Sequence, residues 1–254
     1  MHEGIEAIRQ ALKETAEHIR PPASLQRKVM KELELLNNNG DLLGKVTVDT
    51  LGEEDPIDQI IQQLTPGTGK AIYVADGNPD RIISNQTNYA QEPWHEGIDA
   101  IRERLQPYRF STPDDARLER IYVMYGFDSL TEQEKQAMYD EADRTGKPVI
   151  VRDLKKSQRL VGAKLEYSKE GHSFELHILT TTKNRIHVPD IDSHHVERVS
   201  VGGGEGVYLA DAAHQQLLWV VEGAEGSRIQ YDLRTFHAAR EWVWSIAGRL
   251  TSEQ

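Results

Sequence analysis

The stretch "RLVGAKLEYSKEGHSFELHILTT" (residues 159–181) decides the fold class of this chain. Residues 159–168 and 172–181 are rich in the β-branched and aromatic residues that strands favour. The break "KEGH" between them contains a glycine and is typical of a tight hairpin that joins antiparallel strands. We therefore predict an antiparallel β-sheet built around this hairpin.

Further strand-like segments lie on both sides of the hairpin. They are residues 119–126, 147–153, 194–201, 205–211, 215–223 and 227–234. The glycines of "VGGGEG" (Val201–Gly206) join two of these segments, without the lysine and serine or threonine of a phosphate-binding loop. We interpret this segment as a hairpin whose glycines adopt positive φ angles.

Two helices are predicted within this strand-rich part of the chain. "TEQEKQAMYDEADRTGK" (residues 131–147) is acidic, and its N-cap is Ser129 or Thr131. "TFHAAREWVWSIAGRL" (residues 235–250) has an apolar face, and its predicted N-cap is Thr235. We expect this last helix to cover an open face of the sheet, because an uncovered face would expose apolar side chains to water.

The N-terminal part of the chain has a helical pattern. The spacing of apolar residues predicts an amphipathic helix at residues 2–19, which Pro21 and Pro22 end. A second helix is expected at residues 23–36, with an apolar stripe of Leu25, Val29, Leu33 and Leu36. The predicted class is α+β: a curved antiparallel β-sheet covered by a C-terminal helix, with an N-terminal helical region.

Three parts of the chain follow from these patterns. We expect an N-terminal helical arm at 1–40, a mixed α/β connecting region at 41–106, and a domain of antiparallel sheet plus helix at 107–254. The connecting region is expected to hold a strand, a short helix, a hairpin and a longer helix, at residues 45–51, 56–64, 70–85 and 91–107.

One helical phrase occurs twice. "HEGIEAIRQAL" (residues 2–12) recurs as "HEGIDAIRERL" (residues 95–105), with eight of the eleven positions identical. In both copies two isoleucines and a leucine are spaced by three and four residues, which is typical of a buried helical stripe. We interpret the repeat as a reused packing helix, and a binding role for it stays open.

Composition and charge argue against several classes of function. The 254-residue chain has a net charge of -11, so nucleic acid and anionic membranes would be repelled. The aromatic content of 7% argues against a base-stacking surface. We interpret the one basic stretch, "RDLKKSQR" (residues 152–159), as a solvated turn between strands. The chain has no cysteine, which excludes disulfides, thiolate zinc sites and cysteine nucleophiles.

Membrane and export signals are not expected. No apolar run approaches the roughly 18 residues that a membrane helix needs, and the first residues lack the pattern of a signal peptide. We therefore expect a cytoplasmic protein from the chain as it stands, and an extracytoplasmic one if a membrane segment has been removed from it.

The loop "HVPDIDSHH" (residues 187–195) gathers the kinds of side chain that bind zinc or iron. The candidate ligands are His187, Asp190, Asp192, His194 and His195. The loop lacks the HExxH spacing of a helical metal site, which favours a polar loop between strands over a metal site. No other cofactor is indicated.

The last part of the chain carries a recognisable succession of packing motifs. It runs as strand, glycine, strand, apolar-tryptophan strand, hairpin, aromatic strand and helix, at Val199–Val201, Gly204, Gly206–Tyr208, Leu218–Trp219, Ile229–Tyr231 and Ile246–Leu250. With "FSTPDDARLERIYVMYG" (residues 110–126) as its opening, residues 107–254 resemble the bacterial domain of unknown function 4367 family. The family's turn in this opening is replaced here by Asp114–Arg117.

The resemblance implies a function without catalysis. Members of that family are C-terminal domains of anti-sigma-factor-like and sporulation-associated bacterial proteins, and their architecture is similar to the lipoprotein-carrier half-barrel. The family pattern carries no catalytic residues. Residues 19–36 are similar to the short helix that precedes the membrane span in such proteins, but this chain has no span between that segment and the domain.

Three functions are therefore expected, in this order. The first is a non-enzymatic binding or regulatory protein, anti-sigma-factor-like or sporulation-associated, that recognises a protein partner. Its candidate contact residues are Trp219, Trp242, Trp244 and Tyr231, and core packing is the other interpretation of the tryptophans. The second is a carrier of a lipid or other apolar ligand. The third is a metal-dependent hydrolase that uses the His187–His195 cluster.

Overall fold

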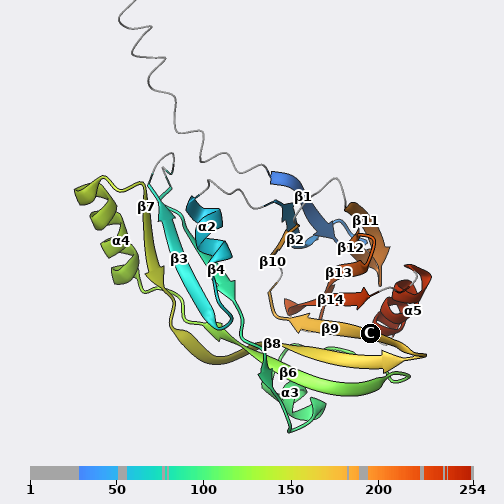
Figure 1. Cartoon of the computed structure of the whole chain (residues 1–254). Helices are drawn as coiled ribbons and strands as arrows, with labels where there is room; N and C mark the ends of the chain where they lie inside the picture. The colour runs from blue at the N-terminus through green and yellow to red at the C-terminus, as the bar shows by residue number, and fades with distance from the viewer. Residues whose placement is uncertain are drawn as a thin grey trace, which may run out of the picture.

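The computed structural model describes residues 29–50, 56–75, 78, 80–181, 183–188, 194–223, 226–236, 238 and 240–252. This part of the chain is mostly antiparallel β-sheet with four short helices, which agrees with the predicted α+β class. The strands form one large sheet and two small ones (Figure 1).

The large sheet has eight strands, and every neighbouring pair in it is antiparallel. In spatial order they are β11 (His195–Val201), β12 (Gly204–Ala210), β13 (His214–Glu222), β14 (Arg228–Phe236), β9 (His172–Leu179), β8 (Lys156–Lys169), β6 (Arg117–Phe127) and β5 (Glu92–Pro93). The predicted hairpin is confirmed, because β8 and β9 pair around Glu170 and Gly171, which both have positive φ. The glycine hairpin is confirmed too, with positive φ at Gly202 and Gly203.

The last helix, α5 (Arg240–Ser252), packs inside the curl of the large sheet, as Figure 1 shows. Its buried side chains Val243, Ile246 and Leu250 meet apolar residues that alternate along the central strands. Leu176 and Ile178 on β9 are two of these. One face of the sheet is thereby covered by the helix, and the opposite face of β9 and β14 carries polar side chains.

The predicted N-cap of this helix is wrong. Thr235 lies in strand β14, opposite Gln215 of β13, and its side chain is buried. The ladder between β13 and β14 continues to Phe236, so the helix starts only at Arg240. Strand pairing therefore overrides the local capping preference of the threonine.

The helix predicted at residues 23–36 is wrong in its described part, because Val29–Leu36 form strand β1. This strand pairs with β2 (Leu42–Asp49) across a turn in which the Asn37 side chain accepts hydrogen bonds from the backbone. Leu33 and Leu35 are buried while Glu34 between them is exposed, as expected when successive side chains point to opposite faces. The helix predicted at 2–19 lies outside the described residues.

A third strand completes the small sheet that contains β1. Strand β10 (Lys183–His187) pairs in parallel with β2, although it lies more than a hundred residues further along the chain. The sheet packs on the large sheet through a second core cluster, in which Leu35 and Val46 meet Leu209 and Leu218. This contact covers the face of β12 and β13 that α5 leaves open.

The other small sheet has the order β4-β3-β7, and two helices lie near it. Its strands are β3 (Thr68–Val74), β4 (Ile83–Asn88) and β7 (Val149–Asp153), and the helices nearby are α2 (Pro56–Gln62) and α4 (Glu132–Thr145). Of the two predicted N-caps, Thr131 caps helix α4: its hydroxyl accepts a hydrogen bond from Glu134 N, and the helix ends at the left-handed Gly146. Met138 packs on Tyr73 and Ile150 of the sheet.

The second copy of the repeated phrase forms a helix, α3 (Ile98–Arg104), that is shorter than the predicted 91–107. Residues 92–93 pair with β6 instead. Ile101 and Leu105 are buried in the main core, which agrees with a packing role, and the first copy lies outside the described residues.

Strand pairing crosses the predicted division into three parts. Strands β2 and β3 pair with β10 and β7 of the last part, and the division at 1–40, 41–106 and 107–254 stays a prediction. Among the described residues, no helix combines the length and the apolar character needed to cross a bilayer.

Candidate functional site

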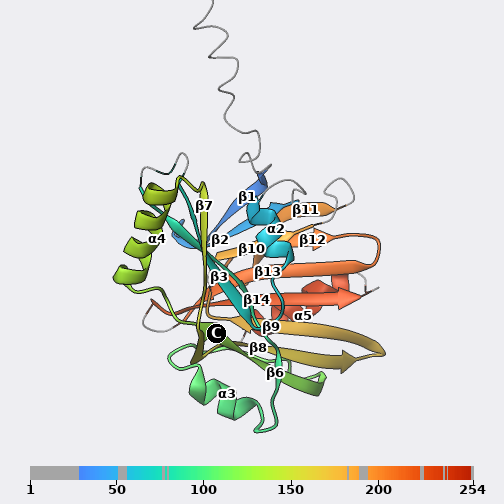
Figure 2. The ribbon, with the colours of Figure 1, turned by 60° about the vertical axis from the view of Figure 1, so that its left-hand side comes forward.

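A cleft of about 730 Å³ lies where the three sheets meet. Its lining combines residues on the face of the large sheet opposite α5, which form its floor, with residues of β4 and β10. Figures 1 and 2 show the two small sheets that contain these strands beside the large sheet. The floor residues His177 and Leu179 on β9, and Asp232 and Arg234 on β14, are two positions apart on each strand. That spacing places them on one face of the sheet, because side chains alternate along a strand.

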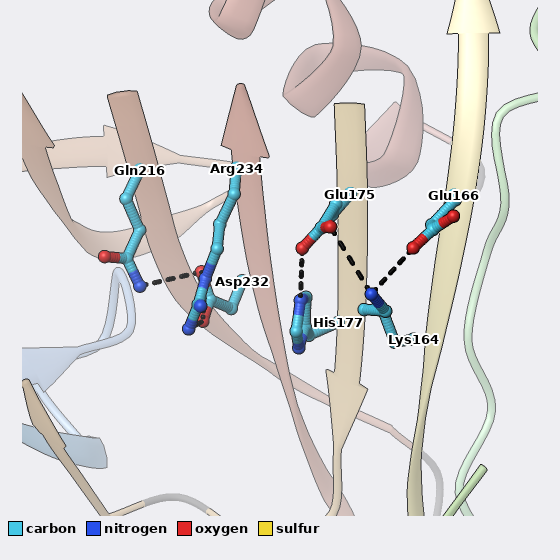
Figure 3. A network of polar contacts seen from close by, with 7 residues as sticks. All are labelled: Lys164, Glu166, Glu175, His177, Gln216, Asp232 and Arg234. Atoms are coloured by element: carbon cyan, nitrogen blue, oxygen red, sulfur yellow. Dashed lines mark hydrogen bonds and ion pairs between the residues drawn. The ribbon is translucent and has the colours of Figure 1, made fainter. Parts of the chain in front are cut away.

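A network of polar contacts spans the floor and the strands beside it (Figure 3). The buried Lys164 on β8 donates hydrogen bonds to Glu166, at 2.7 Å, and to Glu175, at 3.4 Å. His177 Nε2 lies 3.2 Å from the other Glu175 oxygen. The hydrogen bond with His177, together with the positive charge of Lys164, outweighs burial and lowers the pKa of Glu175 to about 2.

Lys164 stays positively charged although its side chain is buried. Burial opposes that charge, but the hydrogen bond to Glu166 and the charge of Glu175 outweigh it and raise the pKa of Lys164. The ammonium also lies 4.7 Å from the centre of the Tyr122 ring, which favours a cation. Arg120 on the neighbouring strand β6 also pairs with Glu166. The positive charges of Lys164 and Arg120 are therefore balanced by the negative charges of Glu166 and Glu175.

A second part of the network surrounds Asp232, which is only 1% exposed. Arg234 donates to it through Nε and Nη2, the latter at 2.7 Å, and Gln216 donates to it at 2.9 Å. Burial works against the Arg234 charge, yet the charge of Asp232 prevails and raises the pKa of Arg234. The charge of Arg234 is therefore offset by its own neighbour.

The wall at β10 carries a cross-strand pair. His187 Nδ1 lies 2.7 Å from Asp49 Oδ1, and the two residues are opposite one another in the parallel ladder. Asp49 is 2% exposed, whereas His187 borders the cleft. A buried carboxylate of this kind orients the imidazole ring and fixes which ring nitrogen faces the cleft.

Two basic side chains at the cleft lie outside these networks. Arg159 near the start of β8 and Lys183 at the start of β10 are exposed cleft residues, and neither makes an ion pair with a described residue. Among the charged cleft residues, Asp232 and Arg234 neutralise each other. The described lining of the cleft therefore has an excess of positive charge, in a chain whose net charge is -11.

The predicted contact residues lie elsewhere. Trp219 and Tyr231 are fully buried on the α5 face of the sheet, stacked with ring centroids 5.0 Å apart, and the Tyr231 hydroxyl accepts a hydrogen bond from Ser111 N. Trp242 meets Phe174 edge to face, and Trp244 meets Tyr208 in the same way. These contacts are core and rim packing, and none of the four residues borders the cleft.

The predicted metal ligands do not come together in the described part of the chain. His187 pairs with Asp49, His194 lies 3.5 Å from Asp211, and His195 lies 3.2 Å from Glu197. Asp190 and Asp192 lie outside the described residues. Within the described ranges, no group of three histidine, aspartate or glutamate side chains is arranged to hold a metal ion.

Sequence reasoning missed the cleft and its polar floor. The signal that could have found them is the alternation of polar with apolar residues at Lys164 and Glu166, at Glu175 and His177, and at Asp232 and Arg234. Alternation predicts which residues share a face, but a polar face is normally solvated. Only the folding of two small sheets against this face shows that it is enclosed.

No family model, no curated protein and no solved structure gave a significant match to the chain. The resemblance of residues 107–254 to the bacterial domain of unknown function 4367 family therefore stays a prediction from the sequence.

Proposed function

We propose that the protein is a non-enzymatic binding protein that holds an acidic segment of a partner protein in the cleft between its three sheets. The observation that carries this proposal is the pair of exposed cations at the cleft, Arg159 and Lys183, which make no ion pair with any described residue. An acidic chain that keeps two exposed basic groups beside an otherwise neutralised floor is suited to an anionic partner group.

The lipid-carrier alternative has less support. A carrier of this type would hold its apolar ligand within the curl of the large sheet, and that space is taken by Val243, Ile246 and Leu250 of α5. The cleft itself is lined by amides, charged groups and histidines as well as by apolar residues. Such a lining suits a polar segment better than a lipid chain.

A regulatory role, anti-sigma-factor-like or sporulation-associated, is the biological setting that the sequence resemblance implies. It is compatible with a cleft that recognises a protein segment. The metal-dependent hydrolase has less support, because His187, His194 and His195 each face a separate carboxylate.

A binding assay with synthetic peptides tests the proposal. The probe is a fluorescein-labelled octapeptide of alternating valine and glutamate, compared with the valine–lysine octapeptide, and anisotropy reports binding. The variant Arg159→Gln/Lys183→Gln should weaken binding of the acidic peptide at least tenfold, and added salt should weaken binding to the wild-type protein.

A matched control separates the cleft from overall charge. Arg144→Gln/Lys155→Gln removes two exposed cations that do not border the cleft, so the net charge changes equally. Its affinity should stay within about twofold of wild type. Equal weakening by both double variants, or equal binding of the acidic and basic peptides, would contradict the proposal.

A further inference from the structure

The outer edge of strand β4 opens into the cleft. Five consecutive residues, Asn85 to Tyr89, border the cavity. Side chains of a strand point alternately to opposite faces, so a cavity over one face would be bordered by every second residue only. A cavity bordered by consecutive residues runs along the edge of the strand, where backbone groups are accessible.

The hydrogen-bond pattern shows which backbone groups lie on that edge. Leu154 N donates to Gly69 O and Ala75 N donates to Pro148 O, so the odd-numbered residues of β3 bond to β7. The even-numbered residues then bond to β4, and Lys70 pairs with Gln86. Asn85 and Thr87 consequently turn their N–H and C=O groups away from β3, toward the cleft.

No described strand pairs with this edge. Strand β4 is the terminal strand of its sheet in the described part of the chain, with β3 as its neighbour. An open strand edge is a template for another strand, since its N–H and C=O groups still need partners.

We infer that the partner segment binds as an extended strand that pairs with the outer edge of β4. This inference rests on the proposed function and adds the conformation of the occupant. The added strand would lie about 4.8 Å from β4. Main-chain hydrogen bonds with Asn85 and Thr87 would supply affinity, and alternate acidic side chains facing Arg159 and Lys183 would supply selectivity.

Strand β10 also ends its sheet, but its edge does not border the cleft in the same way. Lys183 and His187 of this strand border the cavity and are four positions apart, whereas Ile186 packs against the second core cluster instead. That spacing indicates contact through side chains on one face. The edge of β4 is therefore the one that a strand in the cleft would meet.

Substitution of Thr87 tests the pairing. Thr87→Pro removes an N–H that points to the cleft and leaves the bonds between β3 and β4 intact, because proline is tolerated at the outer edge of a sheet. Thr87→Val removes the hydroxyl but keeps the N–H. With the valine–glutamate octapeptide as probe, Thr87→Pro should weaken binding at least tenfold, and Thr87→Val should stay within about twofold of wild type.

Methylated peptides give a test that needs no change to the protein. Two isomers of the valine–glutamate octapeptide carry N-methyl groups on every second backbone nitrogen, on the valines or on the glutamates. In an extended strand only one of these sets faces β4, so at least one isomer should lose tenfold or more in affinity. Binding of both isomers within twofold of the unmethylated peptide would overturn the pairing.

The two proposals can fail separately. If the acidic octapeptide binds and depends on Arg159 and Lys183, but tolerates Thr87→Pro and both methylated isomers, the edge pairing is wrong and the charge-based function stands. If Arg159→Gln/Lys183→Gln leaves its affinity unchanged, the proposed function itself fails. Circular dichroism and thermal unfolding of Thr87→Pro show whether a loss of binding comes from a loss of fold.

Discussion

Glu175 illustrates what enclosure of a polar sheet face does to a single residue. Its carboxylate accepts hydrogen bonds from His177 and Lys164, and its pKa is lowered to about 2. A folded-state pKa below the unfolded value means that the carboxylate stabilises the fold above about pH 4.5. That contribution is lost as the pH falls from there through about 2.

We expect Glu175→Gln to lower the free energy of unfolding by about 2 kcal/mol at pH 7, since a shift of one pKa unit corresponds to about 1.4 kcal/mol and part of the site is solvated. The difference from wild type should shrink steadily between pH 5 and pH 2. Urea unfolding across this pH range measures it. A difference that does not depend on pH would show that the carboxylate charge has no part in the effect.

Gln230 is the opposite case: its buried polar side chain receives no stabilising hydrogen bond from the described residues around it. It is fully buried, and both atoms of its side-chain amide are without a hydrogen-bond partner in the described structure. A buried amide of this kind costs about 1–3 kcal/mol.

Gln230→Met keeps the length of the side chain and removes the unpaired amide. We expect it to raise the free energy of unfolding by about 1 kcal/mol or more, measured by urea unfolding at pH 7. A loss of stability of similar size would mean that the amide is hydrogen-bonded in solution, for example to a buried water molecule.

At the level of secondary structure, β1 shows where sequence patterns are ambiguous. Leu33 and Leu36 fit a helical stripe, while Leu33 and Leu35 fit a strand, and eight residues cannot separate the two periods. The pairing with β2 decides the matter, because β2 brings Val46 and Val48 to the same buried face. Elements with several local signals in agreement were predicted well, such as α4 with its N-cap Thr131.

Two leucine substitutions distinguish the strand from the helix. Leu35 is fully buried in the strand, whereas the helical stripe would bury Leu36 in its place. We expect Leu35→Ala to lower the free energy of unfolding by about 2–5 kcal/mol, and Leu36→Ala to cost clearly less. Chemical denaturation of both variants measures the difference. The reverse order would support the helix.

At the level of the whole molecule, most strands of the large sheet could be predicted from the sequence. Most of them pair with a strand that directly precedes or follows them along the chain. The cleft could not be predicted, because it depends on pairs between distant segments. Strand β10 joins β2, and β7 joins β3 across the whole of α3, β6 and α4. No local pattern encodes such pairs, since their strands are separated by up to 138 residues, as at Asp49 and His187.

These distant pairs predict that residues 107–254 depend on the preceding strands. Without β1 and β2, the side chains Val207, Leu209, Leu218 and Val220 lose their cover. At about 1.5–3 kcal/mol for each side chain, fragment 107–254 should be less stable than the full chain by at least about 5 kcal/mol. Urea unfolding measures the stabilities of fragment 107–254 and of a control fragment, 29–254, that keeps β1 and β2. Equal stability of the 107–254 fragment and the full chain would instead support an independent domain.

Amide hydrogen exchange at β4, measured by NMR with and without a saturating amount of the valine–glutamate octapeptide, reports directly on strand pairing in the cleft. Asn85 and Thr87 have N–H groups on the open edge of the strand, whereas Gln86 already bonds to β3. We predict that the peptide slows exchange at Asn85 and Thr87 at least tenfold more than at Gln86. If exchange at Asn85 and Thr87 stays unchanged while the peptide is bound, the peptide does not pair with the edge of β4.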